Sequence, residues 1–214
     1  GPALDYAVRV VRDRFPSEGA GRGLDVGCAV GRSAFEMAKR CSEVIGIDYS
    51  SAFIEAAERI RTEGKVSYGM NLQGSRSGEY EASLPEGVDP DRAKFRVGDA
   101  HELPTDLGKF DWVLGANLIC RLHHPRRFLD QLPDLLNPGG WLVLNSPFTW
   151  MEEYTEPSEW IGARKEGEDS ATELKRLLEG DFDFVDETAM PFLIRETERK
   201  YQLTFAHSGR WRRR

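Results

Sequence analysis

A strand that runs directly into a glycine turn and a helix is the feature that most constrains the fold of this chain. The segment 24–33 opens with an alternating apolar run, continues through Gly27 and Gly31, and takes up helical spacing from Ser33. Glycine at the turn lets the backbone approach a ligand closely, and a helix start offers free N–H groups to a negative group. The segment therefore predicts a strand–turn–helix unit with a ligand at the turn.

The chain continues this alternation of apolar strands and amphipathic helices. We expect further strands at 44–48, 95–100, 110–117 and 141–146, and helices at 3–15, 33–40, 51–61 and 125–136, the last stopped by 137–140. Strands that alternate with helices form a parallel sheet with right-handed crossovers and a ligand at the carboxyl ends of the strands. The predicted fold class is α/β, a single Rossmann-like domain over residues 3–214.

Several segments extend this pattern. Residues 65–92 alternate apolar and polar positions around a turn at 74–78, which predicts an inserted hairpin that serves as a lid or pocket wall or is merely a tolerated surface insert. Residues 147–169 form a long aromatic loop, the candidate substrate loop. A capping box at 170–173 predicts a helix to about residue 180, and β-rich runs follow at 182–189 and 201–208.

Composition excludes several classes of protein. The 29 basic and 36 acidic residues give a net charge of −7, which argues against a duplex nucleic-acid binder. No apolar run approaches the ~20 residues of a membrane span, and no signal sequence opens the chain, so we expect a cytoplasmic-type protein without membrane contact. Gly1-Pro2 is interpreted as a tag remnant, and Arg210–Arg214 as a solvated terminus, over the alternative of a phosphate-binding tail.

Cysteine and histidine residues do not predict a metal site. Cys28, Cys41 and Cys120 are odd in number and widely spaced, so we expect packing residues rather than ligands or disulfides. His101 and the pair 123–124 are expected at the surface or in caps, and His207 is expected to be a satisfied core residue, with a pocket-facing position as the alternative.

Acidic residues at the ends of successive strands narrow the range of ligands that the turn could bind. The turn lacks the spacing typical of dinucleotide sites because Ala29 stands at the middle position, which makes hydride transfer the weaker interpretation. Asp48 ends the second strand about twenty residues after Gly27, where a carboxylate can hold a ribose diol, and Asp99-Ala100 ends the third.

With Leu103-Pro104, Phe110-Asp111 and Pro138-Gly139-Gly140, this set of motifs resembles the class I methyltransferases that use S-adenosylmethionine. The resemblance implies a mostly parallel seven-stranded sheet with an antiparallel C-terminal strand. It also implies that Asp48 binds the ribose, Asp99 the adenine amino group, and the glycine turn the methionine part. The implied cofactor-binding residues are Asp25, Gly27, Cys28, Gly31, Asp48, Tyr49, Ser50, Asp99, Ala100 and Asn117.

Longer segments carry a narrower resemblance. Residues 24–33, 45–54, 116–122, 146–155 and 191–196, extended by 200–202 and 207–211, are similar to the methyltransferase domain of ovothiol biosynthesis. That family methylates the side-chain-proximal ring nitrogen of 5-thiohistidine, which implies a small-molecule substrate of this type or its selenium analogue, and S-adenosylhomocysteine as coproduct. It also implies an iron-dependent sulfoxide synthase as a companion domain or protein.

The candidate acceptor site is assigned from residue chemistry. Asn117, at the tip of the fourth strand, is the candidate for hydrogen-bonding the imidazole, and Tyr154 the second catalytic candidate. Arg195 is either a bidentate clamp on the substrate carboxylate or a solvated charge at a strand edge. The substrate-binding candidates are Phe148, Glu152, Glu153, Tyr154, Arg195 and Tyr201. Another small-molecule methyltransferase and a non-catalytic module that binds S-adenosylmethionine remain the alternatives.

Overall fold

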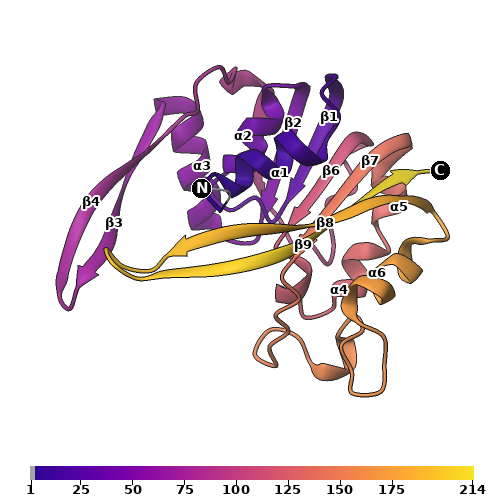
Figure 1. Cartoon of the computed structure of the whole chain (residues 1–214). Helices are drawn as coiled ribbons and strands as arrows, with labels where there is room; N and C mark the ends of the chain where they lie inside the picture. The colour runs from indigo at the N-terminus through magenta and orange to yellow at the C-terminus, as the bar shows by residue number, and fades with distance from the viewer. Residues whose placement is uncertain (1–2) are drawn as a thin grey trace.

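A seven-stranded sheet forms the centre of the molecule. The computed structural model describes residues 3–214, and the proposed tag remnant Gly1-Pro2 lies outside them. The sheet order is β5-β2-β1-β6-β7-β9-β8 (Figure 1). Its strands are β1 (Ala20–Val26), β2 (Cys41–Asp48), β5 (Ala93–Val97), β6 (Phe110–Ala116), β7 (Leu136–Ser146), β8 (Phe182–Arg195) and β9 (Tyr201–Arg213).

Strand direction confirms the predicted sheet. The first five strands in the order pair in parallel, whereas β9 pairs antiparallel with both β7 and β8. This is the Rossmann-like arrangement of class I methyltransferases, in which the carboxyl ends of the parallel strands meet at one edge.

Helices cover both faces of the sheet. They are α1 (Tyr6–Arg14), α2 (Arg32–Ala38), α3 (Ser51–Glu63), α4 (Pro125–Leu129), α5 (Leu132–Leu135) and α6 (Ser170–Leu178). Alternate strand residues belong to different apolar clusters: Leu114 and Val143 pack with α1–α3, whereas Val113 and Leu142 pack with α4–α6. Both faces are therefore buried, as the continuous apolar strands require.

Two long hairpins extend from this body. The predicted insertion is confirmed as β3 (Lys65–Gln73) paired with β4 (Arg76–Ser83), and the outer half of β8–β9 reaches it (Figure 1). Gln73 Nε2 donates to a Glu198 carboxylate oxygen over 3.4 Å, and the Arg195 guanidinium lies 5.4 Å from the centre of the Tyr80 ring. The insertion thus contacts the tip of the C-terminal hairpin.

Several boundaries differ from the sequence predictions. Strand β1 begins at Ala20, before the predicted segment 24–33, and the missing Cβ at Gly23 lets α2 pack closely on it, because a Cβ there would lie 2.7 Å from the Met37 methyl carbon. The predicted helix 125–136 is two short helices, because Pro133 removes an N–H group. The predicted stop at 137–140 lies inside β7, where Gly139 has a φ of 75°.

The prediction of a solvated terminus at 210–214 is wrong. These residues continue β9 up to Arg213, the Trp211 side chain is fully buried, and Arg210 pairs with Asp186. The predicted capping box is also displaced: Asp169, not Ser170, caps α6, since its carboxylate accepts from the backbone N–H groups of Ala171 and Thr172.

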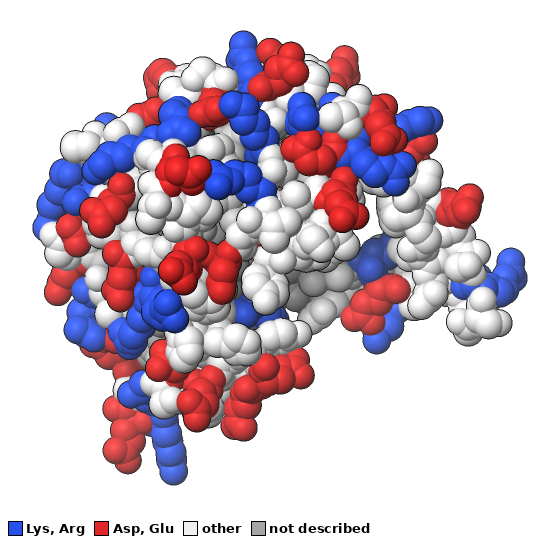
Figure 2. All heavy atoms as spheres, turned by 180° about the vertical axis from the view of Figure 1, so that it is seen from behind, with Lys and Arg blue, Asp and Glu red and all other residues white. Residues whose placement is uncertain are grey.

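The surface carries mixed charge. Figure 2 shows acidic and basic side chains interspersed over the back of the molecule, and the sequence has a net charge of −7. None of the described helices combines the length and the apolar character that a bilayer span needs.

Candidate active site

A hollow of about 320 Å³ opens at the carboxyl ends of β1, β2 and β5, where the sequence predicts the ligand. Its size is within the range of small-molecule sites. Its walls are formed by Val26, Gly27, Ile47, Asp48, Tyr49, Gly98, Asp99, Ala100, His101, Leu118, Arg121, Leu122 and His123. Five of the ten predicted cofactor-binding residues are in this wall: Gly27, Asp48, Tyr49, Asp99 and Ala100.

The glycine turn is held in a left-handed conformation. Gly27, Ala29 and Gly31 have φ values of 75°, 47° and 86°, and the Gly27 N–H donates to the Ile47 carbonyl over 2.8 Å. A Cβ at Gly27 would lie 3.0 Å from Leu118 Cδ1 in the pocket wall. Glycine here therefore keeps the pocket open and avoids backbone strain.

Gly31 instead allows the Phe95 ring to pack closely against the turn, because a Cβ at this position would lie 2.6 Å from that ring. Cys28, another predicted cofactor residue, is buried with its thiol beside Gly46, and burial raises the pKa of that thiol. Neither residue belongs to the pocket wall.

Asp48 is fixed by the turn that it faces. One carboxylate oxygen accepts from the Ala29 N–H over 2.8 Å, and the other accepts from the Ser50 N–H over 2.9 Å. A carboxylate oxygen has two lone pairs, so each oxygen keeps one for a ligand. This orientation fits two hydroxyl donors on adjacent carbons, as in a ribose.

Asp99 is held by a histidine that was expected at the surface. Asp99 Oδ1 accepts from both the backbone N–H and Nδ1 of His101, at 2.8 and 2.6 Å. Burial of Asp99 opposes ionisation, but these hydrogen bonds prevail and lower the pKa of its carboxyl. The surface prediction for His101 is wrong, because its side chain is 15% exposed and lines the pocket. Asp99 Oδ2 remains available to an amino group.

Asp25 lies buried beneath the turn. Its Oδ2 has no hydrogen-bond partner among the described residues. Burial, with a smaller contribution from the Asp48 charge, raises the pKa of Asp25 to about 7. A cationic group close to Asp25 would offset the cost of a negative charge at this buried position.

Asn117 follows β6 at the same edge of the sheet. It has a φ of 56°, and its backbone N–H donates to the Asn145 carbonyl over 2.8 Å. Its side-chain oxygen accepts from the Tyr6 hydroxyl over 3.3 Å. Leu118, the next residue, is in the pocket wall, so Asn117 lies between the cofactor pocket and the loop that follows β7.

The aromatic loop begins with another left-handed residue. Phe148 has a φ of 50°, its N–H donates to Ser146 Oγ, and its ring lies 5.3 Å from the His207 ring. Tyr154 is 38% exposed beneath the Arg121 guanidinium, 5.0 Å away. Glu152 and Glu153, the two acids among the predicted substrate-binding residues, are exposed.

Arg195 and Tyr201 lie at the outer end of the β8–β9 hairpin. Arg195 donates to the Thr197 carbonyl and lies 6.0 Å from the Tyr201 ring centre. Six residues separate Arg195 from Ala189, which pairs with His207, so Arg195 is about 20 Å further along the strand. The structure does not bring these two residues to Asn117, and their substrate role stays a prediction.

Tyr6 and Glu187 were not predicted from the sequence. The Tyr6 hydroxyl contacts Asn117, and a Glu187 carboxylate oxygen lies 2.8 Å from His207 Nε2. His207 Nδ1 is buried without a partner among the described residues, so its prediction as a satisfied residue is wrong. Tyr6 lacks a local signal, since it occupies an ordinary apolar helix position far from Asn117 in the chain.

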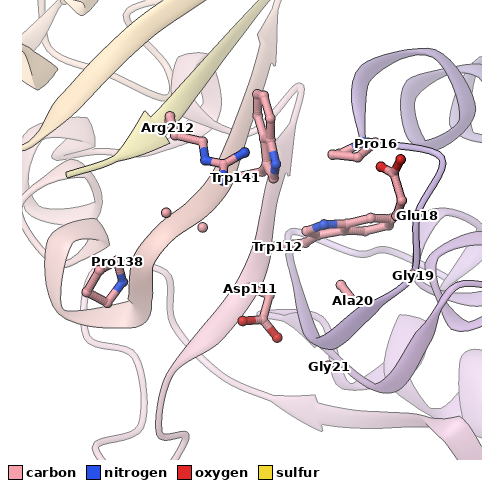
Figure 3. Close-up of a pocket in the computed structure, with 12 residues that line it drawn as sticks. Pro16, Glu18, Gly19, Ala20, Gly21, Asp111, Trp112, Pro138, Trp141 and Arg212 are labelled. Carbon is pink, nitrogen blue, oxygen red and sulfur yellow. The ribbon is translucent and has the colours of Figure 1, made fainter.

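A larger hollow, of about 510 Å³, lies at the opposite edge of the sheet (Figure 3). Asp111 in its wall accepts from the Arg22 N–H and from the Asn137 amide, and Arg212 lies over the Trp141 ring. Asp111 and Arg212 thus already have partners within the protein. This edge of the sheet contains the starts of the parallel strands and not their carboxyl ends. We therefore place the functional site at the carboxyl edge.

Comparison with known proteins agrees with this geometry. A family model described as a methyltransferase domain matches residues 24–144, more than half of the 214-residue chain. The chain belongs to this methyltransferase family. Enzymes of this class take the methyl group from S-adenosylmethionine, which confirms the predicted enzyme class and cofactor.

Curated relatives of this methyltransferase are distant. The probable chloroplastic tocopherol O-methyltransferase of Oryza sativa subsp. japonica is 26% identical over 136 residues, 64% of this chain and 31% of that protein. The demethylmenaquinone methyltransferase of Clavibacter sepedonicus is 28% identical over 141 residues, 65% of this chain and 47% of that protein. The match therefore spans less than half of either relative.

Solved structures share the fold. N-methyltransferase NodS from Bradyrhizobium japonicum WM9, in complex with S-adenosyl-L-homocysteine, has a TM-score of 0.60 at 18% identity, covering 97% of this chain and 85% of that chain. A methyltransferase structure from Methanosarcina mazei has a TM-score of 0.63 at 19% identity, covering 95% and 96%.

Proposed function

We propose that this methyltransferase transfers the methyl group of S-adenosylmethionine to the side-chain-proximal imidazole nitrogen of 5-thiohistidine or its selenium analogue. The observation that carries the proposal is Asn117, a polar side chain between the cofactor pocket and the Phe148 loop. Asn117 and Phe148 lie in two of the segments, 116–122 and 146–155, that carry the resemblance to the methyltransferase domain of ovothiol biosynthesis. The product is ovothiol or its analogue, and an iron-dependent sulfoxide synthase, as a domain or a protein, supplies the thiohistidine.

The residues at the carboxyl edge fit the cofactor. Asp48 keeps one lone pair on each oxygen for the ribose hydroxyls, and Asp99, which lines the pocket, keeps Oδ2 for the adenine amino group because His101 binds only Oδ1. The cationic groups of the cofactor would favour the ionised form of the buried Asp25 carboxyl, whose Oδ2 has no partner among the described residues. Gly27 leaves room for the methionine part.

The chain needs mainly to position the acceptor. S-Adenosylmethionine supplies an electrophilic methyl group, whose bond to sulfur breaks as the nitrogen lone pair forms the new bond. Holding the reacting atoms in line yields effective molarities of ~10⁵ M or more, so a strong general base is not required. The product imidazolium then releases its other N–H proton to water.

The decisive experiment incubates the protein with 5-thiohistidine and methyl-labelled cofactor and locates the label by mass spectrometry and NMR. We expect one methyl group on the ring nitrogen. Absence of transfer to this substrate, with turnover of another acceptor, would refute the substrate; binding of the cofactor without transfer to any thioimidazole would favour a non-catalytic module.

Variants test the acceptor residues separately from the cofactor. Asn117→Ala and Arg195→Ala are expected to lower turnover with thiohistidine while cofactor affinity, measured by calorimetry, is retained. Arg176→Ala, an exposed arginine on α6, is the matched control. Wild-type kinetics in either variant would remove that residue from the acceptor site.

A second candidate is O-methylation of a small phenol or quinol. His207 Nε2 lies 2.8 Å from a Glu187 carboxylate oxygen, as in a histidine base oriented by an acid, and a substrate hydroxyl would have to reach the other ring nitrogen, the buried Nδ1. The curated relatives include a tocopherol O-methyltransferase and a ubiquinone biosynthesis O-methyltransferase. A panel of quinols and thioimidazoles under the same assay separates the two candidates, and His207→Gln would abolish only the O-methyl product.

A further inference from the structure

A chain of buried and partly buried hydrogen bonds connects the ion pair of Arg14 and Asp186 to Asn117, on the side of the site where the methyl acceptor is proposed to bind. Arg14 Nε donates to Ser208 Oγ over 3.0 Å, and Ser208 Oγ donates to Asn145 Oδ1 over 2.7 Å. Asn145 Nδ2 donates to the Tyr6 oxygen over 3.0 Å, and the Tyr6 hydroxyl donates to Asn117 Oδ1 over 3.3 Å. These five residues form what we call the Arg14 relay.

The direction of the bonds in the Arg14 relay follows from its donors and from the orientation of the Asn145 amide. A guanidinium has donors only, so the Ser208 oxygen accepts from Arg14. Ser208 then donates to Asn145 Oδ1, and the opposite end of that amide, Nδ2, also donates to Met190 Sδ over 3.7 Å. The Asn145 amide then turns its NH2 group to Tyr6, whose own proton is left for Asn117. Arg14 is itself fixed, because its Nη2 lies 2.5 Å from an Asp186 oxygen.

Burial makes this order strict. Ser208 and Asn145 are fully buried, so none of their polar groups can turn to water without loss. Burial also raises the pKa of Tyr6 to about 12, so the phenol keeps its proton at neutral pH and remains a donor. The Asn117 oxygen is therefore occupied by Tyr6.

The Asn117 amide consequently offers N–H groups to the site. Among the described residues, no acceptor receives a hydrogen bond from Asn117 Nδ2. A group that accepts from this NH2 needs a free lone pair. This condition separates the three polar atoms of a thioimidazole: the side-chain-proximal nitrogen uses its lone pair on the methyl group, the second ring nitrogen carries N–H, and the thiolate sulfur has free lone pairs.

We infer that the Arg14 relay holds the Asn117 amide as a hydrogen-bond donor to the sulfur, or selenium, of the acceptor. The inference rests on the proposed function and names the positioning device of that site. A hydrogen-bonded thiolate is a weaker nucleophile, and its lone pairs are directed away from the methyl group. The ring nitrogen, although harder and less reactive, is then the atom in line with the methyl group.

The test variant is Tyr6→Phe, which removes the hydroxyl but retains the ring, 4.8 Å from the Phe192 ring. The matched control is Tyr68→Phe on the exposed β3 strand. The readout is the ratio of N-methyl to S-methyl product from 5-thiohistidine. We expect this ratio to fall by about tenfold in Tyr6→Phe, because the loss of one oriented hydrogen bond frees the amide to turn, and to stay unchanged in the control.

Ser208→Ala is a second variant that interrupts the Arg14 relay at a distance from the acceptor, and it should lower the ratio in the same direction. Melting curves verify that each variant folds. An unchanged product ratio in both folded variants, with a wild type that methylates nitrogen, would overturn the inference and leave the proposed function intact.

A measurement without any methyl acceptor tests the Arg14 relay independently of the proposed reaction. The side-chain amide signals of Asn117 in ¹⁵N-labelled protein are identified by their loss in Asn117→Asp. We expect them to shift and to exchange faster with solvent in Tyr6→Phe, but not in Tyr68→Phe. If the wild type methylates neither atom, the proposed function fails; if these signals do not respond, the relay fails.

Discussion

Two carboxylates at the strand ends, Asp48 and Asp99, are the residues proposed to bind the ribose and adenine of the cofactor. Asp48 receives two backbone N–H donors and Asp99 receives two donors from His101, so both enter the pocket with their orientation already determined. Preorganised acceptors of this kind bind a donor pair without the cost of ordering a flexible side chain.

For Asp48 we predict a direct loss of cofactor affinity. Asp48→Asn replaces one acceptor oxygen by a donor NH2 group that opposes both the backbone N–H and the ribose hydroxyl. The dissociation constant for S-adenosylmethionine should rise by roughly tenfold to a hundredfold, as for a lost charged hydrogen bond. Calorimetric titration measures this, with Asp183→Asn, an exposed acid paired with Arg214, as the control. Equal affinity of Asp48→Asn and wild type would contradict the ribose assignment.

The raised pKa of Asp25 predicts that the free energy of unfolding depends on pH. Its pKa is about 7 in the folded protein and 3.8 in the unfolded chain. Between these values the unfolded chain releases the proton while the folded state keeps it, so the stabilisation present below pH about 4 is lost as pH rises through about 7. The loss is roughly 4 kcal/mol for this shift.

Urea unfolding of the cofactor-free protein between pH 4 and 8 measures this effect. The free energy of unfolding of wild type should decline with pH relative to Asp25→Asn, which cannot titrate at this position. Parallel curves for the two proteins would show that Asp25 does not have the raised pKa.

The glycine turn acts at the scale of an element, since it joins β1 to α2 and borders the pocket. Gly27 and Gly64 have similar φ values of 75° and 81°, but only a Cβ at Gly27 meets a neighbour, Leu118 at 3.0 Å. The two positions therefore separate backbone strain from obstruction of the pocket.

We predict that Gly27→Ala and Gly64→Ala each lower the free energy of unfolding by about 1–2 kcal/mol, the cost of a left-handed residue with a side chain. Only Gly27→Ala should also weaken cofactor binding, because its methyl group moves Leu118 into the pocket. Thermal unfolding and calorimetric titration measure the two effects. A matching affinity loss in Gly64→Ala would point to a general destabilisation instead.

At the scale of the whole molecule, the C-terminal hairpin completes both the core and the site. Strand β9 places Trp211 in the apolar cluster under α6 and Ser208 in the Arg14 relay, while its outer half meets the β3–β4 insertion. Packing and, in the proposed relay, acceptor orientation thus depend on the same strand.

Trp211→Ala tests this contribution. The side chain is fully buried, so we predict a loss of about 3–5 kcal/mol of unfolding free energy, as for a large buried aromatic residue. Denaturant unfolding measures it, with Trp160→Ala in the partly buried loop as a comparison that should cost less. A small effect at Trp211 would restore the view of 210–214 as a solvated terminus.

The cofactor half of the site was predictable because its signals are local. Asp48 and Asp99 each end an apolar strand, and the parallel arrangement of such strands brings their carboxyl ends together without further information. The insertion was predictable as a hairpin from its alternation, although its contact with Arg195 and Glu198 was not.

The amino-acid sequence by itself determined the α/β fold, the glycine turn and the acids at the strand ends that line the pocket, because periodicity and strand ends are properties of neighbouring residues. Only the tertiary structure decided which side chains complete the acceptor side. Tyr6 and Asn145 are 139 residues apart, and their hydrogen bond exists because α1 packs on the same sheet face as the end of β7. Such contacts follow from the packing of segments that are far apart in the chain, which no local sequence pattern predicts.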